Sequence, residues 1–384
     1  MLNFLFYTVP ILNQSFGALI TIFIVVKLSP ESTGELAKIV STSALIFPFF
    51  TMRIDTLIAH ERNKEFLIEL REIKNFLFNI MLISVMCTLF LCAKGIIDQS
   101  MAFSVYGAVL MAGYAIQYAS YVQDKKRKSI IISRTINLMI GILILPVVIL
   151  KISPLSIYIL QIVRNNSSFF VIYLHNIISG VRKKRLRNPI TSIRKHWNRI
   201  GLLWLDYAFN QATTNIIILY ATLVDKEIGG TFFIVYTAIN SLNAIYSRTI
   251  GLNFVLLAGD DKFKALKYFL AKQSVRIFSV CLLIGIISIT FLQNSPFAED
   301  WPDLTSMILM CIPLAMLVLI VSSASQYYLM SDNLQELLKI NIIAGIAKVV
   351  TFIIVYKTTN SVSIALCSSV TLFYTAHIIN LVKK

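Results

Sequence analysis

The sequence predicts an all-α integral membrane protein with twelve transmembrane helices in two lobes of six helices each. The first observation is composition: the 384 residues are 57% hydrophobic and 14% charged, with a mean hydropathy of +0.75. Soluble domains are about half apolar and a quarter charged. The second observation is that long apolar stretches recur along the whole chain. The third is that Lys and Arg residues gather in alternating loops.

Twelve apolar stretches are each long enough to cross a hydrocarbon layer of roughly 30 Å as a helix. The first six are Phe4–Val26, Glu35–Ala59, Phe76–Ala93, Met101–Val122, Ser129–Leu150 and Pro154–Ile178. The second six are Gly201–Leu223, Thr231–Ala258, Val275–Gln293, Leu304–Met330, Ile340–Lys357 and Ser361–Val382. No basic residue precedes Phe4, so we expect the first span to be retained and not cleaved as a signal peptide.

Basic residues predict the orientation of the chain, because they are retained on the cytoplasmic side of a membrane. One set of loops holds most of them, including Arg182, Lys183, Lys184, Arg185 and Arg187. The opposite loops hold only Lys27, Lys94, Lys151, Lys226 and Lys357. Both termini are therefore expected in the cytoplasm, and the net charge of +16 fits basic loops beside anionic lipid without any nucleic acid partner.

A long basic segment divides the chain. The interpretation is an N-terminal lobe over residues 1–178, a cytoplasmic linker over 179–200 and a C-terminal lobe over 201–384. Parallel six-helix repeats are a recurring plan among secondary transporters, which bind substrate between the lobes.

A faint internal repeat supports this division. In the first predicted lobe, Asn13 and Gln14 are followed by Gly34 and then by Arg53. In the second, Asn210 and Gln211 are followed by Gly230 and then by Arg248 at nearly the same spacings. The repeat therefore predicts an arginine at a similar depth in each lobe.

Seven charged residues lie inside the predicted spans and away from their ends. They are Arg53, Asp55, Arg134, Arg164, Asp206, Arg248 and Lys348. A charge at the centre of a transmembrane helix costs roughly 2.5 to 3.5 kcal/mol on insertion scales, so such residues usually face a cavity or a partner. Cations outnumber carboxylates in this set, so mutual pairing leaves positive charge over. We therefore expect a positively lined, wet cavity that admits an anion, and a diphosphate suits guanidinium groups well.

Arg53 and Asp55 are two positions apart in the second predicted span. In a continuous helix this spacing separates them by about 200°. The expectation is that they do not pair with one another, and that each needs another partner.

Two stretches resemble O-antigen flippases of the Wzx type and related exporters of the multidrug/oligosaccharidyl-lipid/polysaccharide superfamily. The first is "VVKLSPESTGELAKIVSTSALIFPFFTMRID", where Leu28, Ser29, Pro30, Glu31 and Gly34 match a turn that precedes a helix-opening glycine, with Ser29 in place of the usual glycine. The second is "WLDYAFNQATTNIIILYATLVDKEIGGTFFIVYTAINSLNAI", which resembles the start of the second lobe.

The resemblance implies a V of two six-helix bundles and alternating access in a bacterial inner membrane. It implies an undecaprenyl diphosphate-linked glycan, such as an O-antigen or capsule repeat unit, as the cargo, moved from the cytoplasmic to the periplasmic leaflet. Polysaccharide polymerase machinery is an implied partner. It also implies a cavity lined by basic residues, with Arg53, Arg164, Arg248, Lys348 and Arg134 as candidates. Coupling to H⁺ or Na⁺ is implied as well, and Asp55 and Asp206 are the candidate coupling residues.

Other functions stay open. A multidrug or cation exporter of the same superfamily is the main alternative, although a cationic ligand favours carboxylates or aromatic rings over the cationic excess found here. A membrane-embedded polymerase or acyltransferase is a further alternative, but every predicted outer loop is short. No Walker loop, zinc-ligand spacing or nucleophile elbow occurs, so we expect no catalytic residue, metal or cofactor. The five cysteines all lie in spans and are expected to pack as apolar residues.

Overall fold

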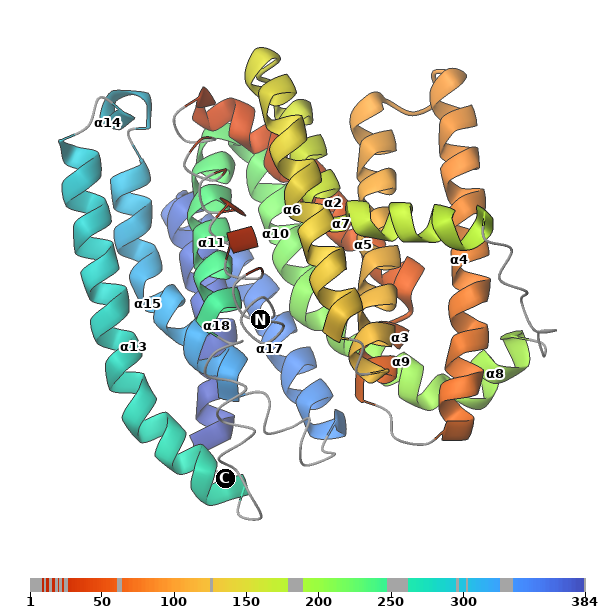
Figure 1. Ribbon diagram of the computed structural model, residues 1–384. Coiled ribbons are helices and arrows are strands. Elements are labelled where there is room, and N and C mark those ends of the chain that lie inside the picture. Colours follow the sequence, from red (N-terminus) through yellow and green to blue (C-terminus); the bar gives the residue numbers. More distant parts are fainter. Residues whose placement is uncertain are drawn as a thin grey trace. The chain divides into compact units, whose positions relative to one another are not determined.

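The computed structural model describes residues 9, 12–13, 16–17, 20, 23, 27–60, 64–124, 127–178, 189–246, 262–294, 297–301, 303–324 and 334–382. Every regular element in these ranges is a helix (Figure 1). Seven of the described helices are long and apolar enough to cross a membrane: Glu65–Ala93, Gln99–Gln123, Lys128–Leu150, Lys272–Thr290, Leu304–Ser322, Gln335–Thr359 and Val362–Leu381. The predicted all-α membrane fold is confirmed.

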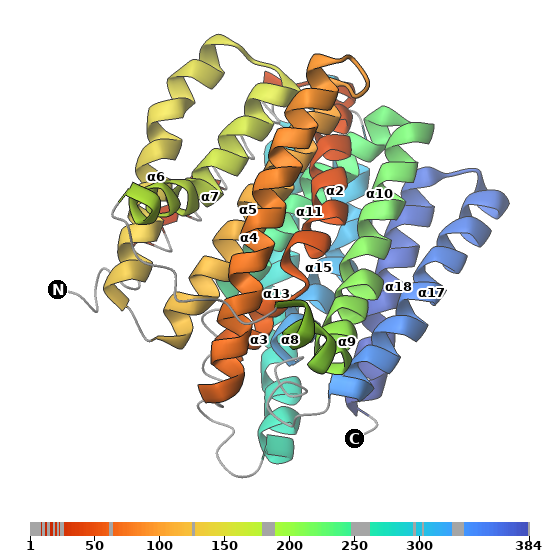
Figure 2. The ribbon, with the colours of Figure 1, turned by 90° about the vertical axis from the view of Figure 1, so that its right-hand side faces the viewer.

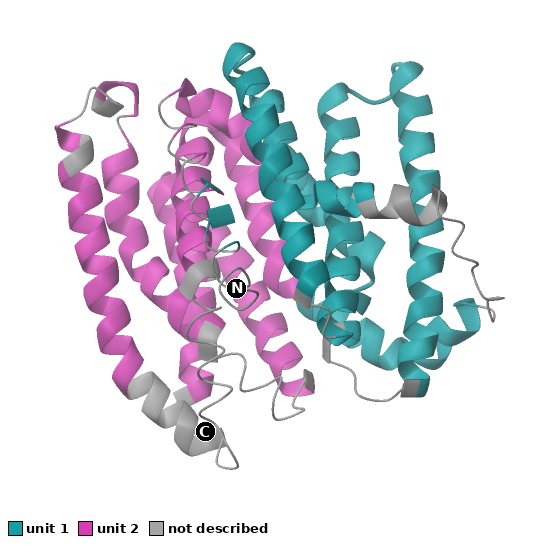
Figure 3. Cartoon of the chain, viewed as in Figure 1, with its two compact units in different colours: residues 1–16, 39–207 teal, residues 17–38, 208–384 magenta. Residues whose placement is uncertain are grey.

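The described helices fall into two compact units (Figure 3). Unit 1 contains Met1–Phe16 and Ile39–Tyr207, and unit 2 contains Gly17–Lys38 and Ala208–Lys384. Helix α2 (Pro30–Thr51) therefore contributes its first turns to unit 2 and its remainder to unit 1. The lobe boundaries drawn from the sequence stay a prediction.

Unit 1 continues through helices that match the predicted spans, with a break in the second span. Its helices after α2 are α3 (Ile54–His60), α4 (Lys64–Ala93), α5 (Gln99–Gln123), α6 (Arg127–Leu150), α7 (Pro154–Ile178), α8 (Pro189–Lys195) and α9 (Trp197–Tyr207). The single helix predicted over Glu35–Ala59 is wrong, because α2 and α3 are separate. The first predicted span lies mostly outside the described residues.

A tight turn joins α4 to α5. Gly95 ends α4 in the left-handed region with φ 70°, which a glycine adopts without steric cost. Its backbone N–H donates to the carbonyl of Cys92 at 3.0 Å. Asp98 then caps α5, because its Oδ1 accepts from the backbone N–H of Met101 at 2.7 Å. Local sequence chemistry thus sets this hairpin of helices.

The centre of unit 1 contains close contacts between α2, α5 and α7. The Ser43 hydroxyl donates to the carbonyl of Ser104 at 2.9 Å and contacts the hydroxyl of Tyr158. A Cβ added at Gly107 would overlap the same Tyr158 hydroxyl. Small residues therefore let α5 and α7 approach, as is usual between membrane helices.

Unit 2 consists of the start of α2 and the helices that follow Tyr207. They are the π-helix η1 (Ala208–Ala212), α10 (Thr213–Val224), α11 (Lys226–Tyr246), α13 (Lys262–Gln293), α14 (Phe297–Asp300), α15 (Leu304–Ala324), α17 (Leu334–Thr359) and α18 (Val362–Val382). Helices α17 and α18 lie side by side (Figure 2). Asn360 turns the chain between them with φ 52°, a conformation that asparagine tolerates.

Two glycines bring the starts of α2 and α11 into backbone contact within unit 2. A Cβ at Gly34 would overlap the carbonyl oxygen of Lys226, and a Cβ at Gly230 would overlap the carbonyl oxygen of Pro30. The Lys226 ammonium also lies 3.5 Å from a carboxylate oxygen of Glu31. The two glycines singled out by the internal repeat are therefore places where only a residue without a side chain fits.

Candidate functional site

Arg53 lies at an abrupt end of α2. The backbone N–H of Met52 still donates to the carbonyl of Pro48 at 2.9 Å, but Met52 and Arg53 then take φ values of 44° and 57°. The N–H of Arg53 donates to Thr51 Oγ1 at 3.2 Å in place of a helical carbonyl. Two consecutive residues other than glycine in the left-handed region are unusual and cost energy. The chain resumes as a helix at Ile54.

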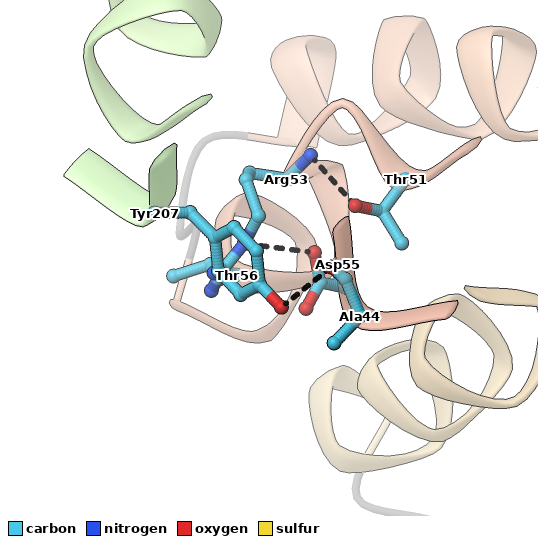
Figure 4. Close-up of polar contacts among 6 residues, drawn as sticks. All are labelled: Ala44, Thr51, Arg53, Asp55, Thr56 and Tyr207. Atoms are coloured by element: carbon cyan, nitrogen blue, oxygen red, sulfur yellow. Dashed lines mark hydrogen bonds and ion pairs between the residues drawn. The ribbon is translucent and has the colours of Figure 1, made fainter. Parts of the chain in front are cut away.

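This break brings Arg53 and Asp55 together (Figure 4). Arg53 Nε lies 3.5 Å from Asp55 Oδ1, and Arg53 Nη2 donates to Thr56 Oγ1 at 2.7 Å. The guanidinium carbon also lies 4.7 Å from the centre of the Tyr207 ring. The expectation that Arg53 and Asp55 do not pair is wrong, because the left-handed backbone replaces the continuous helix on which it depended.

The pair is largely compensated within unit 1. The side chains of Arg53 and Asp55 are 21% and 18% exposed, so neither is freely hydrated. The Tyr207 hydroxyl lies 3.5 Å from the carbonyl of Ala44, which places its ring beside the pair. Asp206, the second candidate coupling residue, is half-buried in the last turn of α9, next to Tyr207 in sequence.

Arg134 lies on α6 and is buried, with 7% of its surface exposed. Its Nη2 donates to the hydroxyl of Tyr118 at 2.9 Å, and its guanidinium carbon lies 5.0 Å from the centre of the same ring. Its Nε is buried and has no hydrogen-bond partner among the described residues. Arg134 is therefore held by an aromatic ring and a neutral hydroxyl, and its Nε–H group is available to a further acceptor.

Arg164 lies near the middle of α7. Its Nε and Nη2 donate to Asn165 Oδ1 at 3.0 and 2.8 Å. Its Nη1 is buried and has no hydrogen-bond partner among the described residues. The aliphatic part packs on α6, where a Cβ added at Gly141 would overlap the Arg164 Cγ. The side-chain hydrogen bonds of Arg164 within the described ranges thus go to a neutral amide on the adjacent residue.

A line of polar contacts joins α6 to α7 between these two arginines. Ser133 and Ser168 hydroxyls lie 2.6 Å apart. Asn137 donates from Nδ2 to the carbonyl of Asn165 at 2.7 Å, and its Oδ1 accepts from the backbone N–H of Ser168 at 2.7 Å. These residues were not among those predicted from the sequence. A signal was present, because Asn165 to Ser168 is a run of four polar residues in an apolar span.

Lys348 lies on α17 in unit 2 and is completely buried. Its Nζ donates to the carbonyl of Asn210 at 3.1 Å and to Thr214 Oγ1 at 2.6 Å. It also lies 4.0 Å from the centre of the Phe373 ring. A backbone carbonyl, a hydroxyl and an aromatic face thus surround the ammonium group.

Helix η1 supplies the carbonyl group that binds Lys348. A π-helix is rare, and single turns of it occur frequently at functional sites. Asn210 lies within η1, and α17 approaches so closely that a Cβ added at Gly345 would overlap the carbonyl oxygen of Phe209. Gly345 is one turn before Lys348, so this contact sets the reach of the lysine.

Three of the predicted cations have no carboxylate partner among the residues that the structure describes. No ion pair within the described ranges involves Arg134, Arg164 or Lys348. Arg248 lies outside the described residues. Among the residues that the structure describes, no group of three or more His, Cys, Asp and Glu side chains could hold a metal ion.

Comparison with solved structures shows which fold the helices form. A lipid II flippase, MurJ, in an inward closed conformation matches with a TM-score of 0.70 and 15% identity over 99% of this chain and 88% of that chain. The chain shares the fold of this flippase. An inward-facing multidrug resistance MATE family transporter of the MOP superfamily matches with a TM-score of 0.55 and 14% identity over 95% of this chain and 97% of that chain.

A eukaryotic MATE transporter, AtDTX14, shares the same fold. Its TM-score is 0.51 and its identity 14%, over 99% of this chain and 91% of that chain. No family model matches the sequence, and no curated protein matches it. The likeness is therefore one of fold, and it confirms the class of multi-pass helical membrane protein predicted from the sequence.

Proposed function

We propose that the protein is a flippase that moves an undecaprenyl diphosphate-linked oligosaccharide from the cytoplasmic to the periplasmic leaflet of a bacterial inner membrane. The observation that carries the proposal is the pair of arginines on α6 and α7. Arg134 and Arg164 each keep a buried N–H group without a hydrogen-bond partner, and no described carboxylate compensates either charge. An intramembrane cation of this kind marks a substrate pathway.

A diphosphate fits the chemistry of these two groups. Guanidinium groups bind phosphate oxygens through charge-assisted, often bidentate hydrogen bonds. Arg164 packs at Gly141, seven residues and about 10 Å along α6 from Arg134. We propose that both side chains take part in binding the two phosphate groups. We assign the diphosphate to Arg134 and Arg164 and the sugars to neighbouring polar groups such as Asn165.

The similarity of fold supports a lipid-linked cargo. One of the matching proteins is a lipid II flippase, and a lipid-linked cargo for this chain is part of our proposal. Alternating access between two units, cytoplasmic termini, coupling to H⁺ or Na⁺ and cooperation with polysaccharide polymerase machinery belong to the same proposal. The reason for the orientation is the concentration of basic residues in one set of loops.

A multidrug exporter is the second candidate, because MATE transporters share the fold. The unpaired cations on α6, α7 and α17 disfavour it, since they repel a cationic drug. The same cations give no evidence for an enzymatic function, and we propose no catalytic activity.

The experiment is deletion of the gene in its native host, followed by analysis of lipid extracts and of surface polysaccharide. A flippase predicts loss of surface polysaccharide and accumulation of an undecaprenyl diphosphate-linked oligosaccharide on the cytoplasmic leaflet. A multidrug exporter predicts unchanged polysaccharide and increased sensitivity to cationic dyes. Unchanged polysaccharide and unchanged lipid-linked intermediates would refute the flippase proposal.

A further inference from the structure

Lys348 has an environment that suits a group that gains and loses a proton during transport. We propose that Lys348 is the coupling residue: its protonation locks α17 to η1, and loss of the proton releases this contact. The inference rests on the proposed transport function for its role in coupling. It differs from the sequence-based candidates Asp55 and Asp206, which are carboxylates in or beside the Arg53 cluster.

The charge of Lys348 is costly to bury. Burying an ammonium group costs several kcal/mol unless partners compensate it. Lys348 is fully buried and has no carboxylate partner among the described residues. Its charge is balanced only by the Asn210 carbonyl, the Thr214 hydroxyl and the Phe373 ring. The charged form is therefore stable only while those groups stay in place.

The two hydrogen-bond acceptors of Lys348 belong to other helices. Asn210 belongs to η1 and Thr214 to α10, whereas Lys348 belongs to α17. The Thr214 hydroxyl donates its own hydrogen to the Asn210 carbonyl at 3.2 Å, so its oxygen is left to accept from the lysine. Separating α17 from η1 and from the adjoining start of α10 removes both acceptors at once. Protonation of Lys348 and its contact with η1 are thus linked, because a ligand, here the proton, shifts a protein toward the conformation that binds it better.

Titratable residues of α11 and α18 lie near the partners of Lys348. His377 on α18 is 3% exposed, its Nε2 has no hydrogen-bond partner, and its ring lies 4.9 Å from that of Phe373. Tyr236 on α11 interacts with Thr214 and with Tyr374 on α18. Among the described residues, the titratable groups linked to Lys348 through Phe373 and Thr214 are therefore one histidine and two tyrosines.

By contrast, Asp55 already has a cation beside it. Arg53 Nε lies 3.5 Å from Asp55 Oδ1, so this carboxylate has a charged partner in its own unit. Lys348 has no described carboxylate partner. The geometry therefore favours Lys348 over Asp55 as the coupling residue.

The test is hydrogen–deuterium exchange of the protein in lipid nanodiscs, measured by mass spectrometry from about pH 6 to about pH 11, a range that includes the ordinary titration of lysine. The amide exchange rates of Ala208–Ala212, which form η1, are corrected for the pH dependence of the intrinsic exchange rate. The variants are Lys348→Met, which is neutral, and Lys348→Arg, which stays charged. Lys357→Met is the control, because Lys357 is an exposed residue of the same helix.

In the native protein, protection of η1 should fall by about tenfold or more as pH rises, the change expected when charge-assisted hydrogen bonds are lost. Protection should stay high in Lys348→Arg and low in Lys348→Met at every pH. Lys357→Met should follow the native curve. The proposal is overturned if Lys348→Met follows the native curve too, or if the native curve is flat.

A second measurement separates this inference from the proposed function. Proteoliposomes are given a fluorescent undecaprenyl diphosphate-linked disaccharide and an imposed pH gradient. Native protein should flip the lipid faster with the gradient, and both Lys348 variants should lose that response. Flipping by native protein that ignores the gradient would overturn the coupling role. No flipping by native protein at all would refute the flippase proposal, while the exchange experiment would still decide whether Lys348 binds the proton as described.

Discussion

Arg53 in unit 1 and Lys348 in unit 2 are both intramembrane cations at irregular backbone, yet they are stabilised in opposite ways. At Arg53, two left-handed residues bring the carboxylate of Asp55 to 3.5 Å. At Lys348, a π-helix presents the carbonyl of Asn210 at 3.1 Å and no described carboxylate is near. The first cation has a carboxylate two residues away, whereas the partners of the second among the described residues are neutral groups on neighbouring helices.

This comparison separates roles that the sequence grouped together. Arg53 is compensated by its own neighbour, and Lys348 is enclosed by groups of unit 2. Arg134 and Arg164 differ from Arg53 because neither forms an ion pair with a described carboxylate. They differ from Lys348 because each retains a buried N–H group without a hydrogen-bond partner among the described residues. We therefore base the anionic cargo on the α6–α7 arginines and the coupling on α17.

The largest expected effect is on Arg164. Changing Arg164 to Ala should lower transport by roughly 30-fold or more, which corresponds to about 2 kcal/mol for loss of a buried charge-assisted contact. Surface polysaccharide in a complemented deletion strain is the measurement, with membrane insertion checked by immunoblot. Arg164→Lys should retain part of the activity, and Lys151→Ala, an exposed residue, should retain all of it. Full activity in Arg164→Ala would contradict the assignment.

Thr214 tests the unit 2 side of the comparison. Thr214→Val removes one acceptor of the Lys348 ammonium and should lower the free energy of unfolding in detergent by about 1 to 3 kcal/mol. Thr213→Val is the matched control, because the Thr213 hydroxyl donates to the carbonyl of Phe209 and does not contact Lys348. Equal effects of the two substitutions would show that Thr214 has no special part in holding the lysine.

Asp55 tests the unit 1 side. Asp55→Asn should destabilise the protein by only about 1 kcal/mol, because the pair is partly exposed and solvent screens it. The same change made together with Arg53→Gln should cost less, since no unpaired cation is left. A double-mutant cycle on thermal unfolding in detergent measures this coupling. A coupling energy of zero would mean that the ion pair does not stabilise the helix break.

The smallest effect concerns the backbone at Met52. Its φ of 44° costs a residue with a Cβ roughly 1 kcal/mol relative to glycine. Met52→Gly should therefore be more stable than Met52→Ala by about that amount, which a shift of the thermal midpoint reports. If the alanine variant is the more stable one, the left-handed turn is not maintained in the membrane.

Much of the helical framework could be predicted because apolar length and loop charge determine where a chain crosses a membrane. The span expected over Pro154–Ile178 coincides with α7. The break at Met52 and Arg53 could not be predicted, since neither residue is a glycine or an asparagine, and Pro48 lies inside the helix without ending it. The partners of Lys348 depend on packing of Gly345 against Phe209, which no local pattern encodes.

The most direct test of the central claim is lipid binding measured by native mass spectrometry on the purified protein. Undecaprenyl diphosphate and the neutral alcohol undecaprenol are offered at equal concentration to the native protein and to the Arg134→Ala, Arg164→Ala double variant. We predict that the native protein binds the diphosphate in preference and that the variant loses the preference while still binding the alcohol. Equal binding of the two lipids by the native protein, or an unchanged preference in the variant, would contradict the claim that these arginines hold an anionic headgroup.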